Sequence, residues 1–464
     1  MWERDRLKRI AVLTNEESAW FNFKNLKNQV NFKIRENKTQ YYNSFFNDNL
    51  GDCKKTWNGI NTILSKNKNL THTEKVVVDD AVINDPLGVS NAFNRHFTGI
   101  GPKLAAKIPV NLNANYDHIN KPENEFELLI VSELVVSKLV EKLSTRKANG
   151  LDNIPACLLK ASAPTTISSL TYIINLVIHT GTVPHDWKRA RVTPIHKEDC
   201  KMDPNNYRPI SVLSVVAKLF EKVIFDQTYE FLCNNNLLSD AQSGFRPLHS
   251  TLTALLDITD KWYSNMDNGL INAILFIDLK KAFDTIDHEI LLNKLSRYGF
   301  KCKTIELFRD YLTGRTQITV VNNIPSDSSD ITCGVPQGSI LGPLLFLLYI
   351  NDLPNCNLIS DGHLYADDTS LTYADNDINQ LLFVMNGDLL SLRNWLNINK
   401  LSLNTLKTKC MFIATRHKLA TLPSQPTVAI DGNIIERVKK YKCLGLELDE
   451  CLMLVYSKFY FVME

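Results

Sequence analysis

Three acidic residues stand next to apolar segments, where carboxylates could hold a metal ion. Asp278 follows a continuously apolar run, residues 273–277, that has the character of a buried strand. Asp367 and Asp368 lie between two short strand-like pieces, and this position suits a tight hairpin. If the hairpin pairs with the strand, the three carboxylates meet. Magnesium prefers hard oxygen ligands, and two such ions about 3.5–4 Å apart can promote in-line phosphoryl displacement.

An acidic pair after an apolar run has little specificity by itself. The same chain contains a second example, because three valines at 76–78 lead directly into Asp79 and Asp80. We assign that second pair no chemistry. A surface turn is therefore the alternative reading of Asp367 and Asp368, and neighbouring motifs have to decide between the two.

The composition is that of a folded protein without a strong overall charge. The 464 residues are 44% hydrophobic and 22% charged, which is enough apolar material for two or three globular units. A formal net charge of +2 gives no global positive field, so any nucleic-acid surface must be local. Residues 2–55 and 188–208 lean basic, and a solvated face is the alternative for the first stretch.

The cysteines and the apolar runs bear on the protein's compartment. The ten cysteines never fall within two to four residues of one another, which argues against a zinc ribbon, and we expect reduced core residues. The first nine residues are charged, and the longest apolar run, residues 343–350, is too short to span a bilayer. We therefore expect an intracellular protein without a membrane partner.

Helical and strand patterns are mixed along the chain. Runs of β-branched or aromatic residues between turn residues predict strands at 191–196, 271–278, 317–321 and 371–373. Apolar spacings of three and four predict helices at 135–143, 167–178, 289–297, 341–350 and 378–396. Ser132 can cap the first of these helices and Gly181 can end the second. This order predicts an α+β fold with helices packed behind a sheet.

The N-terminal region has its own pattern. Residues 16–46 alternate aromatic and basic side chains at helical spacing, and we expect the aromatic rings to be buried. A polar stretch at 103–125 has the composition of an exposed connection, and we place a soft domain boundary there.

Nine further segments follow one another in a fixed order between residues 147 and 449. They are KANGLD (147–152), TPIHK (193–197), NYRPIS (206–211), QSGFR (242–246), FIDLKKAFD (276–284), GVPQGSILGP (334–343), YADD (365–368), NTLKT (404–408) and YKCLG (441–445). In this order the chain resembles the reverse transcriptases of non-LTR (LINE-type) retrotransposons, especially the jockey and chicken-repeat-like lineages. The resemblance implies an RNA-directed DNA polymerase that takes deoxynucleoside triphosphates, an RNA template and a DNA primer or target.

The resemblance also implies roles for the acidic residues. Asp278 and Asp367 would bind both catalytic magnesium ions, with the Leu279 carbonyl as a further ligand and Asp368 in support. Lys407 resembles a lysine near the pyrophosphate leaving group, where it could act as general acid.

Nucleotide contacts follow from the same resemblance. Lys197 and Arg208 would grip the triphosphate, since a guanidinium can hold phosphate oxygens bidentately. A salt bridge at the turn is the alternative for Arg208. Phe283 would lie under the sugar and exclude a ribose 2′-hydroxyl, with core packing as its alternative. Gln337 would contact the nucleotide while Gly338 allows close backbone approach, with a plain loop-to-helix junction as the alternative.

The expected architecture is a right-hand polymerase. Residues 1–125 would be a helical N-terminal extension that leads from an endonuclease domain, 126–246 the fingers, and 247–449 a ferredoxin-like palm, with the reverse transcriptase domain at about 178–449. We expect the thumb to be largely absent and residues 450–464 to be a truncated tail. Residues 441–445 resemble the strand that holds the primer terminus, although Cys443 takes a place often filled by an aromatic residue.

Two other functions compete with polymerisation. The chain could be a truncated remnant that only binds nucleic acid, or an RNA-binding cofactor of the intron-maturase type. The intact acidic motifs favour polymerase chemistry over the first. The lack of a basic C-terminal extension counts against the second. The family also implies a nuclear or cytoplasmic ribonucleoprotein location.

Overall fold

The computed structural model describes residues 2–50, 52–63, 73–78, 81–109, 119, 121–197, 199–423 and 427–452. The chain forms two compact units, Met1–His72 and Thr73–Glu464. The pair Asp79-Asp80 and most of the proposed tail, residues 453–464, lie outside the described residues.

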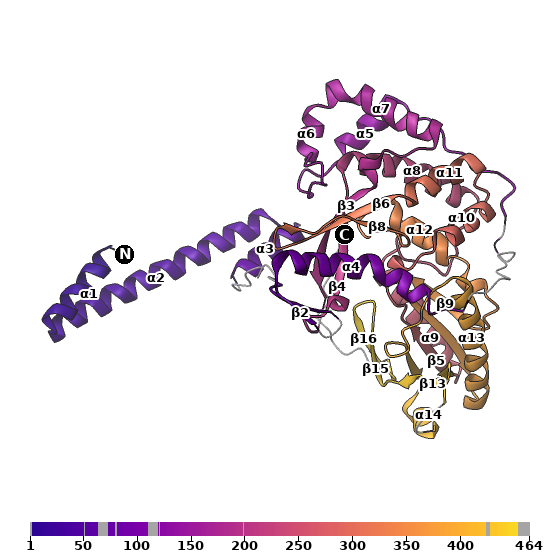
Figure 1. Cartoon of the computed structure of the whole chain (residues 1–464). Coiled ribbons are helices and arrows are strands. Elements are labelled where there is room, and N and C mark those ends of the chain that lie inside the picture. The colour runs from indigo at the N-terminus through magenta and orange to yellow at the C-terminus, as the bar shows by residue number, and fades with distance from the viewer. Residues whose placement is uncertain are drawn as a thin grey trace. The chain divides into compact units, whose positions relative to one another are not determined.

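The first unit is helical. It consists of α1 (Trp2–Thr14), α2 (Glu17–Asp48) and α3 (Cys53–Ile63), and α1 lies against α2 (Figure 1). The predicted helices are confirmed, but the expectation that the aromatic rings are buried is wrong for most of them. Phe23 is 9% exposed, whereas Phe21 and Phe32 are 64% and 68% exposed. A helix that packs on one neighbour covers only a single stripe of its surface, so the rings outside that stripe stay in solvent.

One of the two five-stranded sheets of the second unit is built around a strand that is buried on both faces. Its order is β14-β11-β5-β10-β9, with β14 (Glu436–Arg437), β11 (Lys409–Ile413), β5 (Ile271–Ile277), β10 (Asp368–Asp375) and β9 (Asp361–Tyr365). Residues 273, 275 and 277 of β5 enter one hydrophobic core, while 274 and 276 enter another. Side chains alternate between the faces of a strand, so two cores require a continuously apolar sequence.

Helices cover this sheet on its two faces. Helix α9 (Thr251–Asp267) contacts β5 and β9, and α13 (Ile378–Ile398) contacts β10 (Figure 1). Trp262 of α9 is fully buried, and its ring nitrogen donates to Thr372 of β10 at 3.1 Å. The strands that carry the acidic motifs are therefore held on a rigid layer.

The second sheet contains strands from distant parts of the chain. Its order is β4-β3-β6-β7, with β8 on β6, and its members are β3 (Arg189–His196), β4 (Tyr207–Val212), β6 (Arg315–Val321), β7 (Ile324–Pro325) and β8 (Ser329–Ile331). Helix α4 (Pro86–Ala105) packs on β6, β7 and β8. Asn94 of α4 is buried and donates to the Asp327 carbonyl at 2.9 Å. The boundary expected at 103–125 thus falls inside the second unit.

The remaining elements complete the second unit. The helices are α5 (Glu133–Glu141), α6 (Ala156–Ala161), α7 (Ala163–Thr180), α8 (Val215–Asn234), α10 (His288–Arg297), α11 (Cys302–Leu312), α12 (Leu341–Ile350) and α14 (Arg416–Thr421). The strand pairs are β1 (Val76–Val78) with β2 (Ala81–Ile83), β12 (Ala429–Ile430) with β13 (Asn433–Ile434), and β15 (Lys440–Cys443) with β16 (Leu446–Asp449).

Most predicted elements are confirmed, with bounds that differ by a few residues. Gly181 ends α7 with a φ of 71°, as expected for a left-handed cap. Ser132 occupies the N-cap of α5, but its side chain makes no capping hydrogen bond there. The expectation that the cysteines are core residues holds for Cys410 and Cys443 and is wrong for four others, Cys157, Cys200, Cys233 and Cys302, which are exposed.

Within the described ranges, we find no helix long and apolar enough to cross a membrane.

Candidate active site

The acidic hairpin pairs with the apolar strand, as the sequence predicted. Strand β10 runs antiparallel to β5 and places Thr369 opposite Ile277, so that Asp368 and Asp278 form the next pair in this register. Strands β9 and β10 pair through Tyr365 and Asp368, which leaves Ala366 and Asp367 as the two residues of the turn. Asp368 therefore begins a strand and only Asp367 lies in the turn itself.

Asp278 is fixed by a loop that follows α13. The Asn404 side-chain amide donates to the Asp278 carboxylate at 2.7 Å, and the Asn404 backbone N–H donates to the Asp278 carbonyl at 2.8 Å. The Asp278 backbone N–H donates to the Thr408 hydroxyl at 3.3 Å. Leu279 is buried and bridges to Leu403 of the same loop. Both the backbone and the carboxylate at the end of β5 are thereby held in place.

The three carboxylates influence one another electrostatically. Burial raises the pKa of Asp278 above its ordinary value, and the negative charge of Asp367 adds to this effect. Close packing around the carboxylate and the charges of Asp367 and Asp278 raise the pKa of Asp368 to about 6. The charges of the two neighbouring aspartates repel the ionised Asp368 carboxylate. Such repulsion marks a place where bound positive charge would be stabilising.

The carboxylates do not form a closed metal cage. Among the residues that the structure describes, no group of three or more His, Cys, Asp or Glu side chains could hold a metal ion. Magnesium commonly takes one or two carboxylates and completes its octahedron with water and substrate phosphates.

Three cations named from the sequence lie within electrostatic reach of the acidic residues. The charges of Lys407 and Lys197 lower the pKa of Asp278, and those of Lys197 and Arg208 lower the pKa of Asp368. Lys409, a second lysine two residues after Lys407, forms an ion pair with Glu436 at 2.6 Å. The structure therefore brings Lys407 to the acidic site and engages Lys409 elsewhere.

Another lysine near the site, Lys281, connects the two sheets. The Lys281 ammonium donates to the carbonyls of Asn205 and Tyr207 at 2.9 and 3.2 Å, next to Arg208 on β4. Burial lowers the pKa of Lys281, and the charge of Asp284 opposes this. Sequence reasoning quoted Lys281 within a motif but gave it no role. Its signal was a lysine that lies between the two acidic residues of the same motif, Asp278 and Asp284.

Phe283, Gln337 and Gly338 lie around one junction. The Phe283 ring stacks on Phe346 with centroids 4.3 Å apart. The Gln337 amide donates to the Asp284 carboxylate at 2.8 Å. Gly338 has a φ of 125°, and a Cβ there would lie 2.3 Å from the Ser211 carbonyl oxygen of β4, so glycine is required for this approach.

Asp284, which sequence reasoning also left without a role, lies partly buried beside this junction. Burial raises the pKa of Asp284 to about 6, while the Gln337 hydrogen bond and the charges of Lys281 and Arg208 lower it. A Cβ on Gly101 of α4 would lie 2.2 Å from the Asp284 carbonyl oxygen. Helix α4 therefore packs directly on the backbone that carries Asp284.

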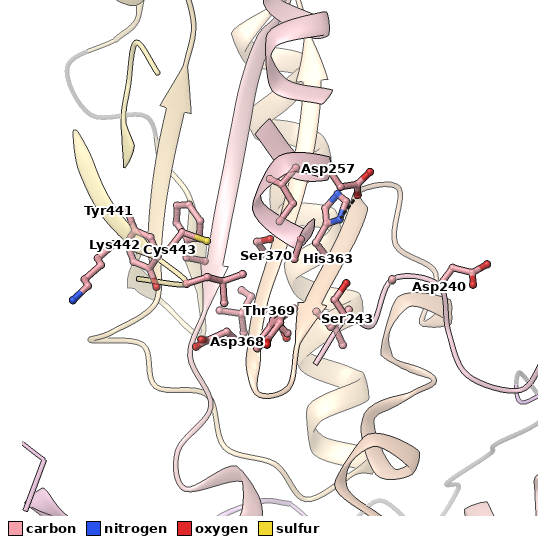
Figure 2. Close-up of a pocket in the computed structure, with 18 residues that line it drawn as sticks. Asp240, Ser243, Asp257, His363, Asp368, Thr369, Ser370, Tyr441, Lys442 and Cys443 are labelled. Atoms are coloured by element: carbon pink, nitrogen blue, oxygen red, sulfur yellow. Dashed lines mark ion pairs between the residues drawn. The ribbon is translucent and has the colours of Figure 1, made fainter. Parts of the chain in front are cut away.

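A pocket lies between the acidic hairpin and the β15–β16 hairpin. Figure 2 shows Asp368 and Thr369 on one side of it and Tyr441 and Cys443 on the other, while the Lys442 side chain points away. The Tyr441 ring stacks on Phe276 of β5 with centroids 3.8 Å apart. Burial and the charges of Asp368, Cys443 and Asp278 raise the pKa of Tyr441 to about 12. The β15–β16 hairpin thus contacts β5 at Phe276, two positions before Asp278.

Comparison with known proteins agrees with this geometry. The chain is 32% identical over 331 residues to the probable RNA-directed DNA polymerase from transposon BS of Drosophila melanogaster, which covers 69% of this chain and 36% of the relative. It is 28% identical over 325 residues to the RNA-directed DNA polymerase from mobile element jockey of the same species, with 68% and 35% coverage. The chain thus spans just over a third of the length of these relatives, and the resemblance to the jockey lineage is confirmed.

A family match covers the same region as the site. Residues 195–448 match the family described as reverse transcriptase (RNA-dependent DNA polymerase). This range contains the three carboxylates of the site, the cations near them, Asp284 and Gly338. Since it covers more than half of the chain, and since the paired strands carry the carboxylates at the positions that the ordered motifs predicted, the chain belongs to the reverse transcriptase family.

Proposed function

We propose that this chain is an RNA-directed DNA polymerase, which adds deoxynucleotides to a primer 3′-hydroxyl opposite an RNA template. The observation that carries this proposal is the pairing of β5 with β10. Thr369 lies opposite Ile277, so Asp368 and Asp278 are the next residues along the two strands, and Asp367 directly precedes Asp368. Three cations lie within electrostatic reach of these carboxylates, as a triphosphate substrate requires. The relatives named above support the same activity.

Two magnesium ions fit the proposed site. Asp278, Asp367 and the Leu279 carbonyl would hold them, with Asp368 in support, and all four offer the hard oxygen atoms that magnesium prefers. The raised pKa values of Asp278 and Asp368 support this fit, because burial and the neighbouring negative charges both oppose the ionised carboxylates, and a bound cation would stabilise the ionised forms. When bound, the ions would help to deprotonate the primer hydroxyl and to stabilise the leaving oxygen.

The cations of the chain would bind the triphosphate. Lys197 and Arg208 would contact its phosphates from the β3–β4 strand pair, and Lys281 would steady that pair through the Asn205 and Tyr207 carbonyls. Lys407, on the loop that holds Asp278, would give a proton to the departing pyrophosphate.

The junction around Phe283 would select the sugar. The Phe346 ring holds Phe283 from one side, so a 2′-hydroxyl against Phe283 would meet a ring that cannot move aside. The Asp284 hydrogen bond would fix the Gln337 amide toward the nucleotide, and Gly338 would keep this segment close to β4.

We assign the regions of the fold accordingly. Residues 126–246 would be fingers and 247–449 a palm, within a reverse transcriptase domain of about 178–449, and β15–β16 would hold the primer terminus. Residues 1–125 would be an N-terminal extension and 450–464 a tail. Strand β6 refines this assignment, since it pairs with β3 and would join the fingers sheet although it belongs to the palm by sequence.

Primer extension on an RNA template tests the proposal. We expect the purified chain to incorporate deoxynucleotides, and Asp367→Ala to reduce the rate by about a thousandfold, or about 4 kcal/mol of transition-state stabilisation. Asp260→Ala, at an exposed position on α9, is the matched control and should keep the parent rate. Equal incorporation by the parent chain and Asp367→Ala would overturn the proposal. RNA binding without incorporation by either would favour the nucleic-acid-binding remnant.

A further inference from the structure

A buried glutamine contacts the turn that carries Asp367. Gln242 is 1% exposed, and its side-chain oxygen accepts hydrogen bonds from the backbone N–H groups of Ala366 at 3.0 Å and Gly244 at 2.7 Å. Its side-chain nitrogen is 3.5 Å from the Ala366 carbonyl, to which it donates. One amide group thus holds both backbone polar groups of a turn residue 124 positions away.

The loop around Gln242 adds a rung to the edge of the sheet. The Leu364 N–H donates to the Ala241 carbonyl, and the Ser243 N–H donates to the Leu364 carbonyl, both at 2.8 Å. Gln242 and Leu364 therefore form a parallel bridge at the free edge of β9. Figure 2 shows Ser243 on this loop beside the hairpin that carries Asp368.

Gly244 closes the contact from the same loop. A Cβ at this position would lie 2.1 Å from the Ala366 nitrogen and 2.8 Å from the Tyr365 carbonyl carbon. Both obstacles are backbone atoms, which cannot rotate away as a side chain can. Glycine is therefore needed at 244 for the loop to reach the turn.

The turn needs such support because its backbone is unfavourable. Ala366 has a φ of 57°, a left-handed conformation that residues with a Cβ rarely adopt. Asp367 follows directly and is exposed, so its own side chain does little to hold the turn. Strained backbone of this kind persists where surrounding contacts over-determine it.

We infer that Gln242 and Gly244 are positioning residues that hold the Ala366–Asp367 turn in the geometry needed to bind the catalytic metal ions. The inference rests on the proposed function, in which Asp367 is a metal ligand. In the proposed site, neither residue is a metal or nucleotide ligand. They act on the backbone of the turn, and through it on the Asp367 carboxylate.

Arg246 secures the loop but not the turn. Its guanidinium donates to the carbonyls of Ser239 and Gln242 at 2.8 and 3.0 Å. The loop therefore has an anchor of its own, and removal of the Gln242 side-chain amide is expected to release the turn without unfolding the loop.

The test uses the full chain, two variants that release the turn and one matched control. Gln242→Met keeps the length and apolar stem of the side chain and removes its hydrogen bonds, whereas Gly244→Ala pushes on the Ala366 nitrogen. Gln317→Met is the control, because Gln317 is also a buried glutamine but its amide donates to Asn94 of α4 at 3.0 Å. Primer extension is measured across a magnesium titration, and hydrogen exchange is measured over residues 361–372.

We expect Gln242→Met and Gly244→Ala to raise the half-saturating magnesium concentration about tenfold and to speed exchange over residues 361–372, with Gln317→Met like the parent in both. A parent-like magnesium requirement in Gln242→Met, with only a lower melting temperature, would assign Gln242 a merely structural role and overturn the inference. If the parent chain shows no primer extension that depends on Asp367, the proposed function is wrong. Hydrogen exchange over residues 361–372 then tests the role of Gln242 without the activity assay, and parent-like protection in Gln242→Met would overturn the inference.

Discussion

The two regions that carry the acidic residues are held in different ways. Asp278 ends a strand that is buried on both faces, and the loop at 402–408 binds its carboxylate and backbone. Asp367 is exposed in a turn whose other residue, Ala366, is buried under the loop at 241–244. The first region is positioned by the core and the second by an edge contact. We therefore expect that the Asp278 carboxylate can be replaced while the fold stays intact. At the turn we expect the converse, since a change in the supporting loop can displace Asp367 while its carboxylate is still present.

The largest effect is expected at Asp278. Asp278→Asn keeps the shape of the side chain and removes its charge, and we expect deoxynucleotide incorporation to fall by at least about a thousandfold. Its folded-state pKa is raised, so the charged form opposes folding above the ordinary aspartate pKa. The melting temperature should therefore hold or rise. Single-turnover incorporation and thermal denaturation check the two effects, and a large drop in melting temperature would contradict the view that the Asp278 charge is not needed for the fold.

A second prediction separates two neighbouring lysines. Lys407→Gln should lower the incorporation rate by about a hundredfold, the usual contribution of a general acid. Lys409→Gln is the matched control, because Lys409 pairs with Glu436, and it should stay within about twofold of the parent rate. Pre-steady-state rates with saturating nucleotide provide the measurement. Equal losses in both variants would assign Lys407 no special role.

A third prediction concerns the amide that holds Asp278. Asn404→Leu removes a hydrogen bond to a carboxylate, a bond worth about 1.5–3 kcal/mol, so we expect a loss of roughly ten- to a hundredfold in incorporation. The half-saturating magnesium concentration should rise with it. Asn379→Leu, at an exposed position on α13, should leave both unchanged. If Asn404→Leu behaves like the parent, the core holds Asp278 without help from the loop.

The smallest effect is a pH dependence at Asp284. Burial raises its pKa to about 6, so the folded protein binds a proton there that the unfolded chain releases near pH 4. This contribution to stability is present at low pH and is lost as the pH rises through about 6. Asp284→Asn should therefore gain melting temperature relative to the parent at pH 7.5 but little at pH 4, because the contribution is lost progressively between the ordinary aspartate pKa and about 6. It should change the nucleotide KM only a few-fold, since an asparagine oxygen can still accept from Gln337. Equal gains at both pH values would contradict the raised pKa.

Local sequence patterns determined much of the framework. The apolar run at 273–277 predicted β5 because a strand buried on both faces needs no polar alternation, and the run at 341–350 predicted α12 with its observed bounds. The order of nine motifs predicted the family, and the match over residues 195–448 confirms it. Such signals survive in the sequence because burial and secondary structure act on neighbouring residues.

Tertiary structure alone decided which residues support the acidic site. Asn404 meets Asp278 across 126 positions and Gln242 meets Ala366 across 124, and neither pairing leaves a local pattern. The exposed rings of Phe21 and Phe32 make the same point, since helical spacing predicts a stripe but not whether another element covers it. The sequence by itself determined which carboxylates and strands are present. The tertiary structure determined which residues hold them. Hydrogen bonds between segments distant in the sequence depend on how those segments pack, and local sequence periodicity does not encode that packing.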